Sequence, residues 1–269
     1  MLVSRMRHNP AFLPFLFLFP FFPMSVIDKA RADRRIAGLL RDVQQRARLR
    51  FEKSDSSEWL SSVDEDRAII EYAGCRHPSA ALAQELLTID MRLRGYRPIR
   101  LGISSLFDQD ATPTFINVLN HELQRHRIYE RFLALGFTPE QFQRDSGKDT
   151  FPYLQQVLMT APDNIARVVP PFLMLLSPGG TLSLDAFQDL YDRFLRINTA
   201  WTRQLLTIEQ LLKDWAGAET LDQTLTVRKL MLTLQPKENF SWFGFKDESG
   251  FPDKGFFIAE AFSVRVIPD

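Results

Sequence analysis

Residues 112–136 read TPTFINVLNHELQRHRIYERFLALG, which is the pattern of one long amphipathic helix. Thr112 can cap the first turn, Pro113 suits the first helical position, and Gly136 is typical of the residue that follows a helix. One face of this segment is mainly apolar and carries Phe115, Leu119, Leu123 and Leu133. We therefore expect the segment to pack within a helical core.

The segments around it are also predicted to be helical. Residues 77–95 contain apolar residues at helical spacing and end at Gly95. Residues 28–51 are predicted to form a basic helix, followed by an acidic, serine-rich connector. Ser62 and Glu65 match a capping box for a further helix that ends at Gly74. A last helix is predicted between Thr220 and Pro236, with a strand as the alternative because both periods occur there.

The longest periodic segment covers about 184–216. Large apolar residues recur there at intervals of seven, without Pro or Gly from Leu184 to Ala216: Phe187, Phe194, Trp201, Ile208 and Trp215. Such spacing predicts one continuous helix that forms the spine of a bundle. Asn198 interrupts a companion stripe, so it either fixes the pairing of the helix or lies at a boundary with water.

The tail of the chain has a different composition. Residues 237–269 hold eight aromatic residues, about twice the average density of the chain. Two apolar runs flank the turn-rich stretch KDESGFPDKG, which indicates a β-hairpin or a short meander. We therefore predict a mainly α fold: a multi-helix bundle with a long heptad-patterned helix (about 184–216) and a small C-terminal β element. Residues 24–269 are predicted to form a single helical domain.

The opening residues 1–23 form an apolar leader rich in Pro and Phe. Its apolar run, residues 11–23, is shorter than the roughly 20 residues that a spanning helix needs, and three prolines interrupt it. We expect no spanning helix. Three interpretations stay open: translated text upstream of a true start at Met24, an export signal or anchor, or a segment at a membrane interface. The single cysteine, Cys75, fits a cytoplasmic location, with export or membrane attachment through residues 1–23 as the alternative.

Charge is unevenly distributed although the net charge of the chain is zero. Residues 1–53 carry eleven Lys and Arg against four acidic residues, a net charge of +7, and the remaining residues carry −7. The two parts can complement each other, or the basic arm can contact an acidic partner or anionic lipid. The sequence lacks the basic, aromatic-interleaved face of a nucleic-acid binder, so no nucleic-acid partner is expected.

The candidate site lies on the 112–136 helix. The stretch HELQRH misses the zinc motif because His121 and His126 are five residues apart, about 140° around the helix axis. Glu122, His126 and Glu130 are each four apart and share one face. These three residues are the candidate ligands of a transition metal, with Asp90 as a ligand from a second helix. The alternative is an ordinary histidine bonded to a glutamate, with no cofactor.

No catalytic motif names an activity, so enzymatic function is left open, with a non-enzymatic role favoured. The first hypothesis is a binding or accessory protein that engages a protein partner through its helical surfaces, with a homo-oligomer as a further expectation. The second is a metal-dependent helical-bundle enzyme centred on Glu122 and His126. The third is an exported or membrane-attached helical protein.

Overall fold

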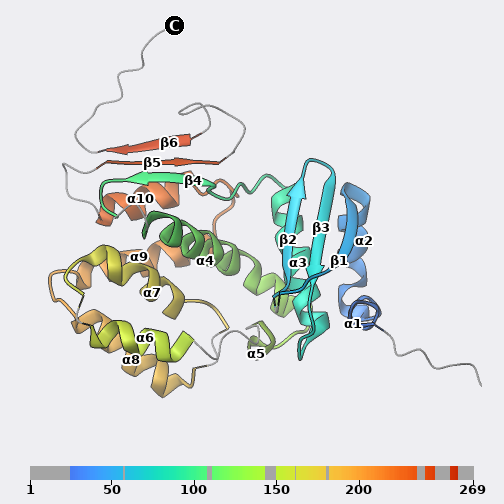
Figure 1. The fold of residues 1–269 in the computed structure, drawn as a ribbon, viewed down its shortest axis with the longest axis horizontal. Helices are drawn as coiled ribbons and strands as arrows, with labels where there is room; N and C mark the ends of the chain where they lie inside the picture. The colour runs from blue at the N-terminus through green and yellow to red at the C-terminus, as the bar shows by residue number, and fades with distance from the viewer. Residues whose placement is uncertain are drawn as a thin grey trace, which may run out of the picture.

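The computed structural model shows a mainly α protein with two small sheets (Figure 1). It describes residues 25–56, 58–107, 111–142, 150–160, 162–179, 182–234, 240–245 and 255–259. The predicted leader, residues 1–23, lies outside the described residues. None of the helices in the described ranges combines the length and the apolar composition that crossing a membrane would need.

Most of the described chain is helical. After the short 3-10 turn Arg34–Ile36, which follows α1, the longer helices carry the core. The helices are α1 (Val26–Arg31), α2 (Ala37–Arg46), α3 (Pro78–Leu93), α4 (Ala111–Ala134), α5 (Pro139–Phe142), α6 (Thr150–Met159), α7 (Ile165–Leu175), α8 (Leu184–Arg196), α9 (Thr202–Ala216) and α10 (Thr224–Leu234). The predicted helices at 112–136 and 77–95 and the last helix before Pro236 are confirmed by α4, α3 and α10.

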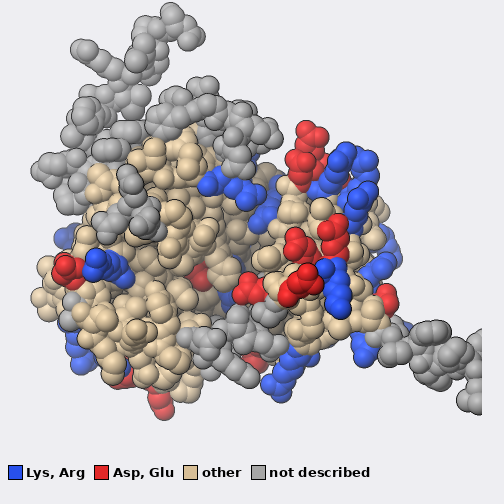
Figure 2. All heavy atoms as spheres, in the orientation of Figure 1, with Lys and Arg blue, Asp and Glu red and all other residues tan. Residues whose placement is uncertain are grey.

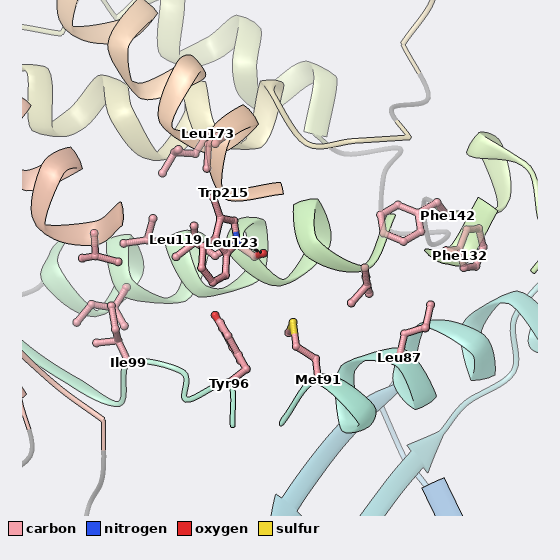
Figure 3. Close-up of a cluster of buried hydrophobic side chains, with 14 of the residues drawn as sticks. Leu87, Met91, Tyr96, Ile99, Leu119, Leu123, Phe132, Phe142, Leu173 and Trp215 are labelled. Carbon is pink, nitrogen blue, oxygen red and sulfur yellow. Dashed lines mark hydrogen bonds between the residues drawn. The ribbon is translucent and has the colours of Figure 1, made fainter. Parts of the chain in front are cut away.

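Helix α4 occupies the centre of the molecule and packs against α3, α7, α9 and the strand β4 (Leu101–Ser104). Figure 3 shows Leu119 and Leu123 of α4 against Trp215 of α9, with Tyr96 on the other side of the indole. The Trp215 Nε1–H donates to the Leu123 carbonyl over 2.7 Å, so the buried indole is fully paired. Gly136 follows the helix at φ 87°, a left-handed conformation that glycine adopts at little cost. This central packing holds α4 against α3, α7, α9 and β4.

The predicted continuous helix over 184–216 is wrong. The helix is interrupted by a turn between α8 and α9. In this turn the Asn198 Oδ1 accepts a hydrogen bond from the Ala200 N–H at 3.0 Å. The Thr202 hydroxyl donates to the Leu195 carbonyl across the same turn. Side chains that bond nearby backbone groups compete with helical hydrogen bonds, and that competition ends α8 here. Phe194, Ile208 and Trp215 are buried, whereas Phe187 and Trp201 are only partly buried.

A three-stranded sheet occupies residues that were predicted to be helical. The basic segment 28–51 divides into α1, the 3-10 turn, α2 and the start of β1 (Arg48–Lys53). The predicted capping box at Ser62 and Glu65 lies instead in β2 (Leu60–Asp64) and in the turn before β3 (Arg67–Tyr72). The strand order is β1-β3-β2, with β1 parallel to β3. Alternate burial along β3, with Ala68 and Ile70 inward, explains why a strand period prevails.

The aromatic tail forms the predicted hairpin, β5 (Phe240–Gly244) with β6 (Gly255–Ala259). Strand β4 joins it as a third, antiparallel strand, which the sequence analysis did not foresee. The sheet lies over α4 at Gly102, where a Cβ would come within 2.5 Å of the Ile116 side chain. Two strands gain stability from a third, and this pairing ties the segment after α3 to the end of the chain.

Candidate functional site: a polar cleft between α3, α4 and β2

The predicted stripe on α4 is divided between buried and exposed positions. Glu122 is 2% exposed and His126 is partly buried, whereas Glu130 is exposed. Glu122 and His126 are one turn apart on the side of α4 that faces the end of α7, where the main chain of Leu176 interacts with the imidazole. The stripe therefore has one buried residue, Glu122, one partly buried residue, His126, and one exposed residue, Glu130.

Glu122 and His126 are incompletely paired. Glu122 Oε1 lies 3.0 Å from the Nδ1 of His121. The buried atoms Glu122 Oε2 and His126 Nε2 have no hydrogen-bond partner within the described part of the chain. Burial lowers the pKa of His126 below its ordinary 6.5, and Arg125 adds to this, whereas Glu122 and the Leu176 main chain oppose it. The imidazole is thus held in its neutral form, which is the form that can bind a metal.

The expectation that Asp90 completes a metal site is wrong. Asp90 is 1% exposed and is bound by three guanidinium groups: Arg46 of α2, Arg94 at 3.0 Å and Arg131 of α4 at 2.7 Å. Burial alone would raise the pKa of Asp90, but the hydrogen bonds from Arg46 and Arg131 outweigh it and hold the pKa below the ordinary 3.8. Through these ion pairs Asp90 connects α2, the end of α3 and α4. The ranges that the structure describes hold no group of three or more metal-binding side chains.

A cleft of about 390 Å³ opens on the other side of α4, between β2, α3 and the segment before β4. Figure 2 shows a hollow between the part that carries β2 and β3 and the larger helical part, with both basic and acidic side chains along it. Residues at helical spacing on α3 and α4 form its walls together with β2 and the segment before β4. The polar lining residues are Ser61, Gln84, Glu85, Thr88, Arg92, Arg100, Asn117, Asn120, His121, Gln124 and Arg125. Its size is in the range of small-molecule sites.

Arg92 is one of the residues that line this cleft. Its Nη1–H donates to the Ser61 carbonyl at 2.8 Å and its Nη2–H to Gln124 Oε1 at 3.3 Å. The buried Arg92 Nε and the buried Ser61 Oγ have no partner among the described residues. Burial lowers the pKa of the Arg92 guanidinium, and the charge of Arg100 adds to this, while Glu85 acts against it.

The positive charge of Arg92 is uncompensated by direct contact. Both of these hydrogen bonds go to uncharged oxygens, and the carboxylate of Glu85, which also lines the cleft, acts electrostatically on the guanidinium. Arg125 differs, because its guanidinium donates to the Ser177 hydroxyl and the Pro178 carbonyl and lies 4.5 Å from the Phe142 ring centroid. A buried guanidinium without an anion is costly, so the cleft is electrostatically suited to receive one.

The rim of the cleft is held rigidly. The Asn120 side chain bonds both main-chain groups of Ile99, accepting from its N–H at 2.9 Å and donating to its carbonyl at 2.7 Å. These bonds fix the segment that carries Arg100 against α4. The sequence analysis missed this site because its walls come from four separate segments. The one local signal was the spacing of Glu85 and Arg92, which are seven residues apart on α3.

Comparison with known proteins gives no relative. No family model matches the chain, no curated protein matches it, and no solved structure matches its fold. The function is therefore argued from the site alone.

Proposed function

We propose that this chain is a binding protein whose cleft between β2, α3 and α4 receives an anionic group, a carboxylate or a phosphate, of its ligand. The observation that carries the proposal is Arg92, a largely buried guanidinium that lines the cleft and whose hydrogen bonds to the described residues both go to uncharged oxygens. An oxyanion could bond to its free Nε–H, and Ser61 Oγ offers a second donor beside it.

The shape of the site favours a small group. A volume of about 390 Å³ accommodates a compact ligand or one side chain. Arg100 lies on the exposed part of the lining, so an entering anion meets positive charge before it reaches Arg92. The anionic group has two sources: a free small molecule, or an acidic side chain of the protein partner that the sequence hypothesis expects. That partner, self-association and a cytoplasmic location stay predictions.

Calorimetric titration with inorganic phosphate and with acetate, in chloride-free buffer, tests the proposal. We expect a dissociation constant below about 1 mM for at least one of them and at least about tenfold weaker binding by Arg92→Gln. Arg203→Gln is the matched control, since Arg203 is an exposed arginine of α9 that does not line the cleft. Wild-type protein that binds neither anion, or equal losses in both variants, would overturn the proposal.

The source of the anion is then separated by a second measurement. Wild-type protein and Arg92→Gln are used to capture proteins from the native host, with and without added phosphate. A partner lost in the variant and displaced by phosphate would assign the anion to an acidic side chain. Direct phosphate binding without such a partner would assign it to a small molecule.

A second candidate function is supported by the two unpaired atoms on α4. Glu122 Oε2 and His126 Nε2 are buried one turn apart, and a carboxylate and an imidazole at this spacing can share a transition metal. Zinc uptake by the purified chain, measured by elemental analysis after dialysis, tests it. One zinc per chain that is lost in His126→Leu but kept in His77→Leu would support a metal-dependent role; absence of zinc from the wild type would exclude it for this metal.

A further inference from the structure

Glu85 places a negative charge in the same cleft as Arg92. Its side chain is 3% exposed, and it lines the cleft together with Thr88 and Arg92. Positions 85, 88 and 92 are three and four residues apart on α3, so the three side chains form one row along the face that borders the cleft. This row has a carboxylate at one end, a hydroxyl in the middle and a guanidinium at the other end.

Both charges of the row can take a partner from a ligand. The buried Nε–H of Arg92 has no hydrogen-bond partner among the described residues. Glu85 acts electrostatically on Arg92 and has further interactions within the protein. A carboxylate has about four acceptor sites, so Glu85 can receive an additional N–H. A simple anion is attracted by Arg92 and repelled by Glu85, whereas a ligand that also carries an ammonium group is attracted by both.

The spacing of the row determines the distance between the two charges of such a ligand. Residues seven apart on an α-helix are separated by about 10.5 Å along its axis. A hydrogen bond of about 2.9 Å at each end leaves about 5 Å for the ligand. An ammonium and a carboxylate joined by three methylene groups span about this distance. An α-amino acid spans only about 2.5 Å between the same groups, so it is too short to reach both residues.

Apolar side chains also line the cleft and suit the methylene groups of this ligand. Leu60 of β2 is 48% exposed, and Ile128 of α4 lines the cleft from another side. Methylene groups that cover Leu60 remove apolar surface from water, which favours binding. The cleft volume of about 390 Å³ is sufficient for a molecule of this size.

We propose that the ligand of this cleft is a small zwitterion, an ω-amino acid whose carboxylate binds Arg92 and whose ammonium group binds Glu85. The inference rests on the proposed anion-binding function, and it assigns the anion to a free small molecule rather than to an acidic side chain of a partner. Glu85 is then the specificity-determining residue, because it distinguishes the zwitterion from a simple carboxylate of the same length.

Calorimetric titrations near neutral pH with matched pairs of ligands test the proposal. γ-Aminobutyrate and butyrate differ by one ammonium group at the same chain length, and glycine and acetate differ in the same way at a shorter length. We expect γ-aminobutyrate to bind about tenfold or more tightly than butyrate, because a charged hydrogen bond contributes about this factor. Glycine should bind less than about threefold more tightly than acetate, because its ammonium group cannot reach Glu85 from a carboxylate bound at Arg92.

Glu85→Gln identifies the residue that receives the ammonium group. It should weaken the binding of γ-aminobutyrate about tenfold and leave the binding of butyrate unchanged or tighter, since it removes a charge that repels a carboxylate. A general disturbance of the cleft would weaken both ligands. Glu219→Gln is the matched control, because Glu219 is an exposed glutamate outside the cleft lining, and this variant should bind both ligands as the wild type does. Thermal unfolding shows whether each variant is folded.

The outcomes separate this inference from the proposed function. Butyrate that binds through Arg92 as tightly as γ-aminobutyrate would overturn the inference and leave the anion site intact. Equal gains for glycine over acetate and for γ-aminobutyrate over butyrate would contradict the two-turn spacing and overturn it as well. A gain that persists in folded Glu85→Gln would place the ammonium group elsewhere, with the same consequence.

No binding of these ligands or of phosphate would overturn both the inference and the proposed function. The comparison of γ-aminobutyrate with butyrate in the wild type needs no variant. It therefore decides the question even where Glu85→Gln does not fold.

Discussion

Asp90 and Arg92 are two residues apart on α3, yet the partners of their charges differ. The Asp90 carboxylate is bound by arginines, whereas the Arg92 guanidinium is bound by uncharged oxygens. Asp90 is 1% exposed and is bound by three guanidinium groups, which come from α2, from the residue that follows α3, and from α4. Arg92, on another face of the same helix, has uncharged oxygens as its hydrogen-bond partners and lines a cleft. A charge with its full set of partners holds elements together, whereas a charge without a counter-ion is available to a ligand.

Removing Asp90 should have the largest effect on stability. Asp90→Ala leaves Arg46, Arg94 and Arg131 without their shared carboxylate at the junction of three helices. We expect a loss of about 3 kcal/mol in the free energy of unfolding, the lower end for a broken buried pair because the arginines are partly exposed. Chemical denaturation measures it.

The matched control for this prediction is an exposed ion pair. Asp66 binds Arg48 at 2.7 Å on the first sheet, with both side chains largely in solvent. Asp66→Ala should leave the unfolding midpoint unchanged, since exposed pairs contribute little. Equal effects of the two variants on stability would contradict the prediction. They would show that the buried ion pairs of Asp90 contribute no more to stability than the exposed pair of Asp66.

The parts of the fold that local sequence patterns determine could be predicted from the sequence. Thr112, Pro113 and Gly136 mark α4 because caps and helix-compatible residues act within one turn. The break between α8 and α9 was not predicted, because the seven-residue spacing of apolar residues continues across the turn. The signal was local but small: Asn198 and Thr202 bond the backbone on either side of the break.

The sheets and the cleft could not be obtained in this way. Strand β4 pairs with β5 across a sequence separation of more than a hundred residues, and β1 pairs in parallel with β3, so neither contact leaves a local pattern. The polar stripe on α4 was visible at a helical period, and along it Glu122 is buried, His126 is partly buried and Glu130 is exposed. The environment of Arg92 was not visible, because the hydrogen-bond partners of its guanidinium, the Ser61 carbonyl and the Gln124 side chain, come from β2 and α4.

His126 differs from both Asp90 and Arg92, because its burial favours the neutral form of the side chain. Its pKa is lowered by burial in the folded state, while the unfolded chain titrates near 6.5. Below about pH 6.5 the unfolded state therefore binds more protons, so the free energy of unfolding rises with pH through this window and falls on acidification, by at most about 1.4 kcal/mol per pH unit. Asp90, whose pKa is lowered below 3.8, loses its contribution only at more acidic pH.

Denaturation curves between about pH 5 and pH 8 measure this dependence, over the range in which histidine titrates. His126→Leu should flatten the curve in that range, since it removes the group that must be protonated on unfolding. Asp90→Asn should leave the slope near pH 6 as it is in the wild type. A slope unchanged by His126→Leu would assign the acid sensitivity to another histidine.

Arg92 should give an effect of opposite sign to Asp90. Arg92→Met replaces a largely buried guanidinium that lacks an anion with an apolar side chain of similar length. We expect the free energy of unfolding to stay constant or to rise by about 1 kcal/mol, because the desolvation cost of the charge is relieved. Phosphate binding should be lost in the same variant. A marked loss of stability instead would make Arg92 a structural residue like Asp90.

Glu130 should have the smallest effect, although it belongs to the same sequence stripe as Glu122 and His126. Its side chain is exposed, and it starts about 12 Å along the helix axis from Glu122, since each residue advances an α-helix by about 1.5 Å. A single ion bound by Glu122 and His126 would leave Glu130 at its far edge, in water. Glu130→Gln should therefore change the free energy of unfolding by less than about 0.5 kcal/mol. It should also leave phosphate binding and any zinc uptake as in the wild type, in contrast to His126→Leu for zinc and Arg92→Met for phosphate. A clear loss of zinc in Glu130→Gln would restore the three-residue site that the helical spacing predicted, and would require the α4 surface to rearrange around the metal.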